Sequence, residues 1–221
     1  MSAMESLPRH QCLIYEGAPS RQLPSLAALT REKLEQNYRC LYLNSAPMVA
    51  GMRSYLAAAG VDVAYEVGKA SLVLSSDQRH LVAGQFDVER MIRTLEEAIQ
   101  QALDDGYAGL WATGDMTWEL GSERDRWRLL EYEWRLEKLF RTHPQLSGIC
   151  QYHADTLPRD LMRQGLLGHP TIFVSKTLSL LNPHYVLPES FTLGAAENVD
   201  LDSAVGHICE HGLLSSPVSS S

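Results

Sequence analysis

Histidine, cysteine, tyrosine and acidic side chains recur at the ends of three short apolar runs in this chain of 221 residues. Each run is short enough to be a buried strand, and in a parallel sheet the residues just past the carboxyl ends of the strands line the ligand crevice. The carboxyl ends of parallel strands share one edge of the sheet, so the three motifs predict a single pocket there. Its expected members are His10, Cys12, Tyr15, Glu16, Asp115, Trp118, Gln151 and Tyr152.

Within that pocket the residue types suggest a division of roles. Ligand pockets are mostly apolar with a few placed polar groups, so Tyr15, Trp118 and Tyr152 are expected to form walls around Asp115 and Gln151. Two alternatives for Asp115 are capping of the next turn and pairing with His10 or an arginine. His10 begins its strand, so a position toward the opposite end of the sheet is its alternative.

A metal site is a second interpretation of some of these residues. His10 and Cys12 are two apart, so on a strand both point to one face, and Cys150, His153 or His169 would complete a nitrogen and sulfur ligand set suited to zinc. The alternative is that the cysteines are core residues of adjacent strands. Structural zinc sites usually contain closely spaced cysteine pairs, which the four cysteines do not form. The spacing therefore favours a pocket or structural role, and we predict no metal.

Catalytic motifs are missing from the sequence. A Walker loop needs G-x-x-x-x-G-K-[ST], but the first run is followed by Glu16-Gly17-Ala18-Pro19-Ser20-Arg21, with no lysine before Lys33. There is no G-x-S-x-G, H-E-x-x-H or G-x-G-x-x-G motif. A nucleophilic pair of Cys150 with His10 or His153 remains open, although nothing in the spacing favours it. We therefore predict that the protein is not an enzyme, assign no catalytic residue and leave any cofactor unassigned.

Taken in order, the motifs resemble the MEDS domain, a sensory module named after methanogens, methylotrophs and the dichloromethane-responsive repressor DcmR. The resemblance rests on H-x-C-x-x-Y at residues 10–15, T-G-D-M-T-W at 113–118, C-Q-Y at 150–152 and the pair His169-Pro170. It also implies a role for Glu133, since the family often carries a Tyr-Glu pair there, which adds Glu133 to the candidate ligand-binding residues. The alternative for Glu133 is a solvated charge beside Glu131 and Glu137.

The resemblance implies a relative of the RecA/KaiC fold that has lost its nucleotide machinery and senses small organic ligands. We therefore expect a non-catalytic sensory domain. The alternative is a degenerate NTPase-like interaction scaffold without a ligand, or, ranked lower, a metal-binding or nucleotide-binding protein. The sequence has no recognisable helix-turn-helix or kinase segment, so the output is expected to pass through a protein partner of a signalling or transcription pathway, or through a homo-oligomer.

Composition and charge limit the classes of partner that this chain is expected to bind. The formal net charge is −8, no Lys or Arg follows Lys176, and no basic stripe of the kind that nucleic-acid binding requires is present. No apolar run approaches the roughly 18 residues of a membrane span. Scattered cysteines are typical of a reduced compartment. We expect a cytoplasmic protein that binds neither nucleic acid nor membrane.

Strand-like and helix-like segments alternate along the chain, which predicts a single three-layer α/β domain with a central, mostly parallel sheet. The strand order follows only from the resemblance. Residues 1–186 are expected to form the sensory domain, and 187–221 an acidic C-terminal tail that is partly disordered. Strands are expected near 11–15, 40–43, 71–74, 108–113, 147–152 and 170–174, helices near 24–37, 47–59, 87–104, 123–141 and 157–166, and an extended piece near 61–66.

Overall fold

A computed structural model describes residues 9–79, 81–119, 126–175, 178–187, 200, 201, 203–206 and 208, with backbone only at 118, 119, 126 and 127. Strands and helices alternate through most of this part. In chain order the elements are β1 (His10–Tyr15), the 3-10 helix η1 (Pro19–Gln22), α1 (Leu23–Glu35), β2 (Tyr38–Leu43), α2 (Ala46–Ala58), α3 (Val63–Gly68), β3 (Leu72–Ser75), β4 (Leu81–Val82), β5 (Gln85–Phe86), α4 (Val88–Asp104), β6 (Gly109–Asp115), α5 (Met116–Glu119), α6 (Arg126–Thr142), β7 (Leu146–His153), α7 (Arg159–Gly168), β8 (Thr171–Ser175) and β9 (Leu178–Leu181).

In the described part of the chain a seven-stranded sheet forms the centre, in the order β3-β2-β6-β7-β1-β8-β9. Its strand pairs are parallel except β8–β9, which is antiparallel. Strands β1 and β7 are almost wholly buried, as expected for parallel strands covered on both faces. The predicted three-layer α/β architecture is confirmed.

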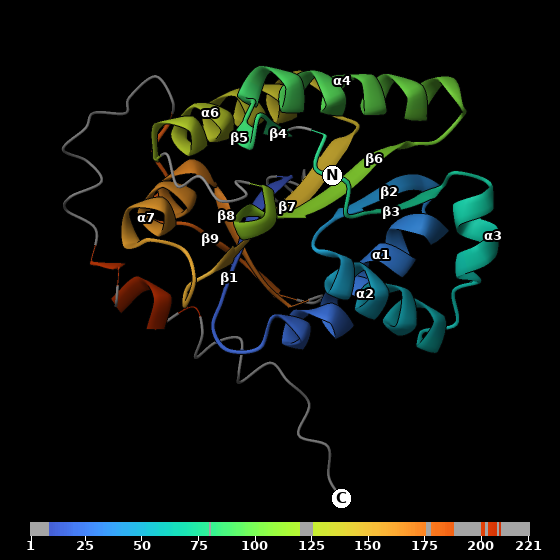
Figure 1. The fold of residues 1–221 in the computed structure, drawn as a ribbon, viewed down its shortest axis with the longest axis horizontal. Helices are drawn as coiled ribbons and strands as arrows, with labels where there is room; N and C mark the ends of the chain where they lie inside the picture. Colours follow the sequence, from blue (N-terminus) through green and yellow to red (C-terminus); the bar gives the residue numbers. More distant parts are fainter. Residues whose placement is uncertain are drawn as a thin grey trace, which may run out of the picture.

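Helices cover the two faces of this sheet in separate groups (Figure 1). On one face α1, α2 and the start of α3 enclose a core cluster that contains Leu13, Tyr15 and Trp111. On the other, α4, α6 and α7 enclose a larger cluster that contains Cys12, Cys150 and Tyr152. Because side chains alternate along a strand, consecutive residues of β1 and β7 therefore face different groups of helices.

Register fixes which residues of β1 and β7 lie side by side. His10 is opposite Gly148, Cys12 opposite Cys150, and Tyr15 opposite His153. A Cβ at Gly148 would lie 2.4 Å from the carbonyl oxygen of Ala112 on β6, so only glycine fits where these strands approach. His10 consequently lies at the amino-terminal end of β1, and Tyr15 at its carboxyl end.

Four local expectations need correction or addition. The piece expected to be extended near 61–66 is mostly the helix α3, because the Asp62 carboxylate accepts from the Tyr65 amide at 3.0 Å and caps it. The loop before α4 contains the hairpin β4–β5, whose turn residues Ala83 and Gly84 both have positive φ, as a two-residue type I′ turn requires. The short helix α5 and the antiparallel strand β9 are additions that apolar periodicity did not indicate.

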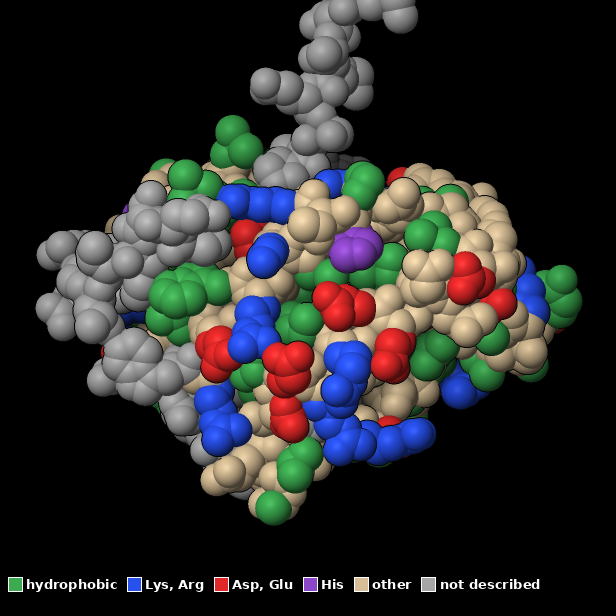
Figure 2. All heavy atoms as spheres, turned by 90° about the horizontal axis from the view of Figure 1, so that it is seen from above, with side chains coloured by type: hydrophobic (Ala, Val, Ile, Leu, Met, Phe, Trp, Pro, Cys, Tyr) green, Lys and Arg blue, Asp and Glu red, His purple; other side chains and the backbone are tan. Residues whose placement is uncertain are grey.

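The outer surface formed by α4 and α6 carries interspersed charges of both signs (Figure 2). The Arg135 guanidinium links the two helices through Glu89 at 2.5 Å and pairs with Glu131 of its own helix at 2.7 Å. On this face the charge pattern is that of a solvated helix surface. Among the described residues, no helix combines the length and apolar character needed to cross a bilayer.

Beyond β9, three apolar side chains of the C-terminal region are buried. Leu201, Val205 and Ile208 join the same core cluster as α4, α6 and α7. Part of the segment after residue 187 thus packs on the domain, while the expected domain boundary at 186 remains a prediction.

Candidate functional site

A phenol and a carboxylate meet at the carboxyl ends of β1 and β6. The Tyr15 hydroxyl donates to Oδ2 of Asp115 at 3.0 Å, and both side chains are buried. Burial, and then the charge of Asp115, raise the pKa of Tyr15 well above its ordinary value. Burial also raises the pKa of Tyr42 on β2, with a smaller contribution from Asp115. Both phenols therefore stay protonated. The Tyr15 hydroxyl donates to the carboxylate, whereas the Tyr42 hydroxyl accepts from the Asn44 side-chain amide at 3.1 Å.

Gln151 lies beside this pair and is held by the sheet. It is opposite Asp115 in the register of β6 and β7, and its side-chain amide donates to the Thr113 hydroxyl at 2.8 Å. That hydroxyl in turn donates to the carbonyl oxygen of Ile149 at 2.7 Å. We call Tyr15, Asp115, Thr113 and Gln151 the strand-end group.

The loops after β1 and β7 meet over the strand-end group. The Tyr15 ring stacks on His153 with centroids 4.9 Å apart, and Nε2 of His153 lies 2.8 Å from the Gly17 carbonyl oxygen. The Gly17 amide donates to the exposed carboxylate of Asp155 at 2.7 Å. Glu16 is exposed in the same loop. These contacts join two loops that lead to opposite faces of the sheet.

That divergence has a known consequence in open α/β sheets. From β1 the chain passes to α1 on one face, whereas from the neighbouring β7 it passes to α7 on the other (Figure 1). Ligands bind outside the carboxyl ends of the strands at such switch points. The topology thus places the strand-end group where ligand crevices form in this class of sheet.

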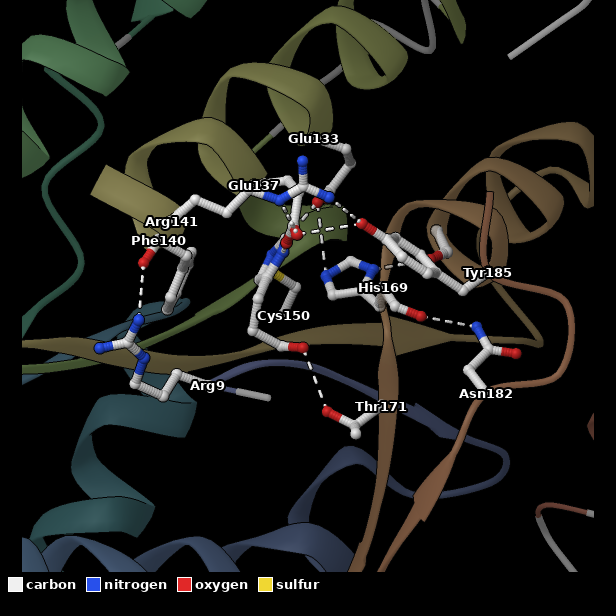
Figure 3. A network of polar contacts seen from close by, with 12 residues as sticks. Arg9, Glu133, Glu137, Phe140, Arg141, Cys150, His169, Thr171, Asn182 and Tyr185 are labelled. Atoms are coloured by element: carbon white, nitrogen blue, oxygen red, sulfur yellow. Dashed lines mark hydrogen bonds and ion pairs between the residues drawn. The ribbon is translucent and has the colours of Figure 1, made fainter. Parts of the chain in front are cut away.

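A second polar group is enclosed between α6, α7 and the amino-terminal half of β1 (Figure 3). Its members are almost completely buried, the most exposed being Cys150 at 6%. Nδ1 of His10 lies 2.9 Å from Glu137, and Nε2 of the same ring lies 3.7 Å from the Cys150 sulfur. We call these residues the buried cluster: His10, Glu133, Glu137, Cys150, Tyr152 and His169.

Glu133 stands at the centre of the buried cluster. Its Oε1 accepts a short hydrogen bond from the Tyr152 hydroxyl. Its Oε2 is buried without a hydrogen-bond partner, at 3.6 Å from Nε2 of His10 and 3.4 Å from Nε2 of His169. Burial raises the pKa of Glu133 to about 8, with Tyr152 acting in the opposite direction. The carboxyl is thus costly to ionise unless a cation compensates it.

Burial also sets the charge of the histidines. It lowers the pKa of His169 well below its ordinary value, and it lowers that of His10 although Glu137 opposes the change. For Glu137 burial acts to raise the pKa, but hydrogen bonds from His10, Tyr185 and Arg141 outweigh it and leave the pKa lowered. The cluster therefore combines two neutral imidazoles with an ionised Glu137 at its edge.

The structure divides the sequence-predicted site residues between these two groups. Tyr15, Asp115 and Gln151 lie in the strand-end group, with Glu16 exposed beside it. His10, Tyr152 and Glu133 lie in the buried cluster on the other face of the sheet, and Cys12 is in the core beside them. The expectation that the motifs share one pocket is therefore wrong, because alternate side chains of β1 and β7 point to opposite faces. The side chain of Trp118 lies outside the described residues.

Three members of the buried cluster were not predicted as site residues from the sequence. Glu137 was treated as a neighbouring surface charge, and Cys150 and His169 as optional zinc ligands. One signal was available: Glu133 and Glu137 are four apart on a helix, so they share a face, and Phe140 of that face is apolar. Two acids on a core-facing helix side indicate a buried polar site.

Two cavities stand out among the described residues. One of about 30 Å³ lies between the sheet and α4 and α6, among apolar side chains together with Thr113 and Cys150. A groove of about 480 Å³ lies between the β4–β5 hairpin, α4 and α6. None of the residues that line the groove belongs to either polar group.

Comparison with known families agrees with this picture. The family model for MEDS, described as the methanogen/methylotroph, DcmR sensory domain, matches residues 9–170. The chain belongs to the MEDS family. The match spans β1 to the residue before β8, so both polar groups fall within the MEDS region. A comparison with curated proteins finds no relative at a significant level of similarity.

Proposed function

We propose that this MEDS domain is a non-catalytic sensor that binds a small organic ligand at the strand-end group and signals through a partner protein or a second copy of itself. Membership of a sensory-domain family supports the sensory role. The observation that carries the location is the buried Tyr15–Asp115 pair at a topological switch point. A buried carboxylate with protonated phenols around it offers both an acceptor and donors to a polar ligand group.

The loop contacts above the group suggest how binding is transmitted. Gly17 links β1 to β7 through one hydrogen bond with Asp155 and one with His153. Such bonds contribute about 0.5–1.5 kcal/mol each, so a ligand with a modest preference for one loop arrangement shifts the balance between two states. These loops lead to α1 and α7, which connects the group to both faces of the molecule.

Two observations, one on the cysteine thiols and one on the loop after β1, support the non-catalytic part of the proposal. Burial raises the pKa of the Cys12 and Cys40 thiols well above the ordinary value, which disfavours the reactive thiolate. The loop after β1 has no Walker glycines or lysine. The rival interpretation is an interaction scaffold that binds no ligand.

Thermal unfolding in sealed cells separates sensor from scaffold. Dichloromethane and methanol serve as small organic probes, and ATP with Mg²⁺ tests the nucleotide-binding alternative. A probe present at 100 times its Kd stabilises the fold by about 2.7 kcal/mol. A saturable shift with an organic probe is expected, whereas no shift with any probe favours the scaffold. Stabilisation by ATP that disappears without Mg²⁺ would contradict the non-catalytic proposal.

Tyr15→Phe tests the location of the site. It removes only the hydroxyl that binds Asp115, so we expect the probe affinity to fall about tenfold, the equivalent of about 1.4 kcal/mol. Tyr55→Phe is the matched control, because Tyr55 is 41% exposed on α2. Isothermal titration of both variants measures the effect. An unchanged affinity in Tyr15→Phe would move the ligand elsewhere, for example to the 30 Å³ cavity.

A further inference from the structure

Four donor atoms of the buried cluster converge from four separate elements. His10 begins β1, Glu133 lies on α6, Cys150 lies on β7, and His169 follows α7 directly. One ligand atom of each residue lies within 4.8 Å of all the others. Together they supply two imidazole nitrogens, a carboxylate oxygen and a sulfur, which is the donor set of a transition-metal site.

The distances agree with tetrahedral coordination. With metal–ligand bonds of 2.0–2.3 Å, two ligands of a tetrahedral zinc site are separated by roughly 3.3–3.8 Å. Nε2 of His10 lies 3.7 Å from the Cys150 sulfur and 3.6 Å from Oε2 of Glu133, and that oxygen lies 3.4 Å from Nε2 of His169. Three of the six distances between ligand atoms thus already lie in the required range. Side-chain rotations that move the other ligand atoms by less than about 1.5 Å would bring the widest pairs into range.

Hydrogen bonds orient both imidazoles for coordination. Nδ1 of His169 lies 2.6 Å from the Gly165 carbonyl oxygen, and Nδ1 of His10 lies 2.9 Å from the Glu137 carboxylate. Both partners only accept, so each neutral ring carries its proton on Nδ1. The unprotonated Nε2 atoms are then the ones that lie 3.6 and 3.4 Å from Oε2 of Glu133. Carbonyl or carboxylate partners that fix a histidine tautomer are the usual surroundings of a metal-bound imidazole.

Without a cation the centre of the cluster is unsatisfied. Oε2 of Glu133 and Nε2 of His169 are buried and have no hydrogen-bond partner. They face each other at 3.4 Å, too far for a good hydrogen bond even if the carboxyl were protonated. A divalent cation would satisfy both atoms, and its charge would balance a Glu133 carboxylate and a Cys150 thiolate. Buried polar groups left without partners are rare and costly in native proteins.

We propose that His10, Glu133, Cys150 and His169 bind one divalent transition-metal ion, with Zn²⁺ as the best fit. Nitrogen and sulfur donors exclude Mg²⁺ and Ca²⁺, which prefer oxygen ligands. Four protein ligands in a closed, buried centre are the arrangement of a structural zinc site. The absence of closely spaced cysteines argued against a metal in the sequence, but that signal belongs to sites with two or more cysteines, and here one cysteine suffices.

Metal content and cobalt substitution test the proposal in the full chain. Purified protein is stripped with a chelator, reloaded with Zn²⁺ and analysed by elemental mass spectrometry, where one equivalent per chain is expected. Loading with Co²⁺ should give a sulfur-to-cobalt charge-transfer band together with the strong visible bands of tetrahedral cobalt. No uptake of Zn²⁺, or cobalt spectra without the sulfur band, would overturn the proposal.

Variants assign the ligands. Cys150→Ser and Glu133→Gln should each weaken Zn²⁺ binding at least tenfold, and Cys150→Ser should abolish the charge-transfer band. Cys40→Ser is the matched control, because Cys40 is a buried cysteine in the other core cluster. If Cys150→Ser fails to fold, Glu133→Gln remains, since an amide keeps the shape of the side chain and an acceptor for Tyr152. Full affinity in a folded Glu133→Gln or Cys150→Ser variant would refute the site.

A double variant, His207→Ala with His211→Ala, controls for metal bound by histidines near the C-terminus and should keep one equivalent. Loss of the metal in this variant alone would overturn the assignment. The metal proposal is independent of the strand-end ligand, because Tyr15→Phe should leave Zn²⁺ content unchanged. Failure of one proposal is thereby distinguished from failure of the other.

Discussion

Glu137 belongs to the buried cluster but is not one of the four proposed metal ligands, and it orients one of them. Its carboxylate accepts from His10 at 2.9 Å on one side, and from Arg141 and Tyr185 at 3.0 Å on the other. Burial and the neighbouring Glu137 raise the pKa of Tyr185 to about 12, so this phenol remains a donor. Glu137 is thus held by the partly exposed Arg141 and Tyr185 while it fixes the ring of a buried histidine.

We predict that Glu137→Gln weakens Zn²⁺ binding by about 10–100-fold, the usual effect of changing a partner of a metal-bound histidine. The amide keeps the size of the side chain but weakens the charge-assisted bond that sets the His10 tautomer. Competition with a chelating dye measures the affinity. Glu131→Gln, an exposed acid on the same helix, should leave it unchanged. Equal affinities in wild type and Glu137→Gln would show that Glu137 does not position His10.

At the scale of single residues, the sequence located Tyr15, Asp115 and Gln151 correctly near one another, since each follows from the position of a strand end. It misplaced His10, Tyr152 and Glu133, because the face toward which a residue points depends on the register of β1 and β7. Register and helix packing involve neighbours distant in sequence, which motif spacing does not reveal. The ligand-binding role of these residues stays a prediction.

Helix α7 reaches the buried cluster because two of its residues have no side chain. A Cβ at Gly165 would lie 2.4 Å from the Tyr152 ring, and a Cβ at Gly168 would lie 3.2 Å from the Cβ of Glu133. Both neighbours are fully buried, so neither can swing away into solvent. Gly165 therefore sets how closely α7 approaches the sheet, and Gly168 how closely it approaches α6, and together they fix the position of His169.

We predict that Gly165→Ala destabilises the fold by about 1–3 kcal/mol, the cost of overpacking a dense core. Alanine favours a helix by up to about 1 kcal/mol, but a ring contact 1 Å too short outweighs this gain. Chemical denaturation measures the change. Gly68→Ala at the end of α3 is the control, because a Cβ there meets nothing within 4 Å, and it should be neutral or stabilising. A stabilised Gly165→Ala variant would contradict the packing argument.

Among the elements, long amphipathic helices and apolar strands were predictable, and α4 begins one residue after its expected start. Short elements were not. Helix α3 depends on one cap from Asp62, and the β4–β5 hairpin on a two-residue turn, which are weaker signals than a repeated apolar pattern. Strand β9 runs antiparallel along β8 at the edge of the sheet, and such an edge pairing leaves no periodic signature.

For the whole molecule, the alternation of elements was enough to predict a mostly parallel sheet between two layers of helices. The strand order was not, since it depends on which crossovers pass over which face. The observed order puts β1 between β7 and β8, so the first strand joins the last part of the domain. The relationship to the RecA/KaiC fold stays a prediction from the family resemblance.

Because of that strand order, the proposed metal would connect elements that are far apart in the sequence of the domain. Its four ligands come from β1, α6, β7 and the segment between α7 and β8, so unfolding separates all of them and releases the ion. A ligand that binds only the folded state adds to stability as its free concentration rises above its Kd. At 100 times the Kd, Zn²⁺ should therefore raise the free energy of unfolding by about 2.7 kcal/mol relative to chelated protein.

Urea denaturation at several buffered concentrations of free Zn²⁺ measures this dependence. The midpoint is expected to rise with free Zn²⁺ in wild type and in Cys40→Ser, and to stay constant in Cys150→Ser. Because the metal joins both ends of the domain, the transition should remain a single cooperative step. A Zn²⁺-independent midpoint in wild type, or a rise of equal size in Cys150→Ser, would show that the cluster does not hold the fold together through a metal.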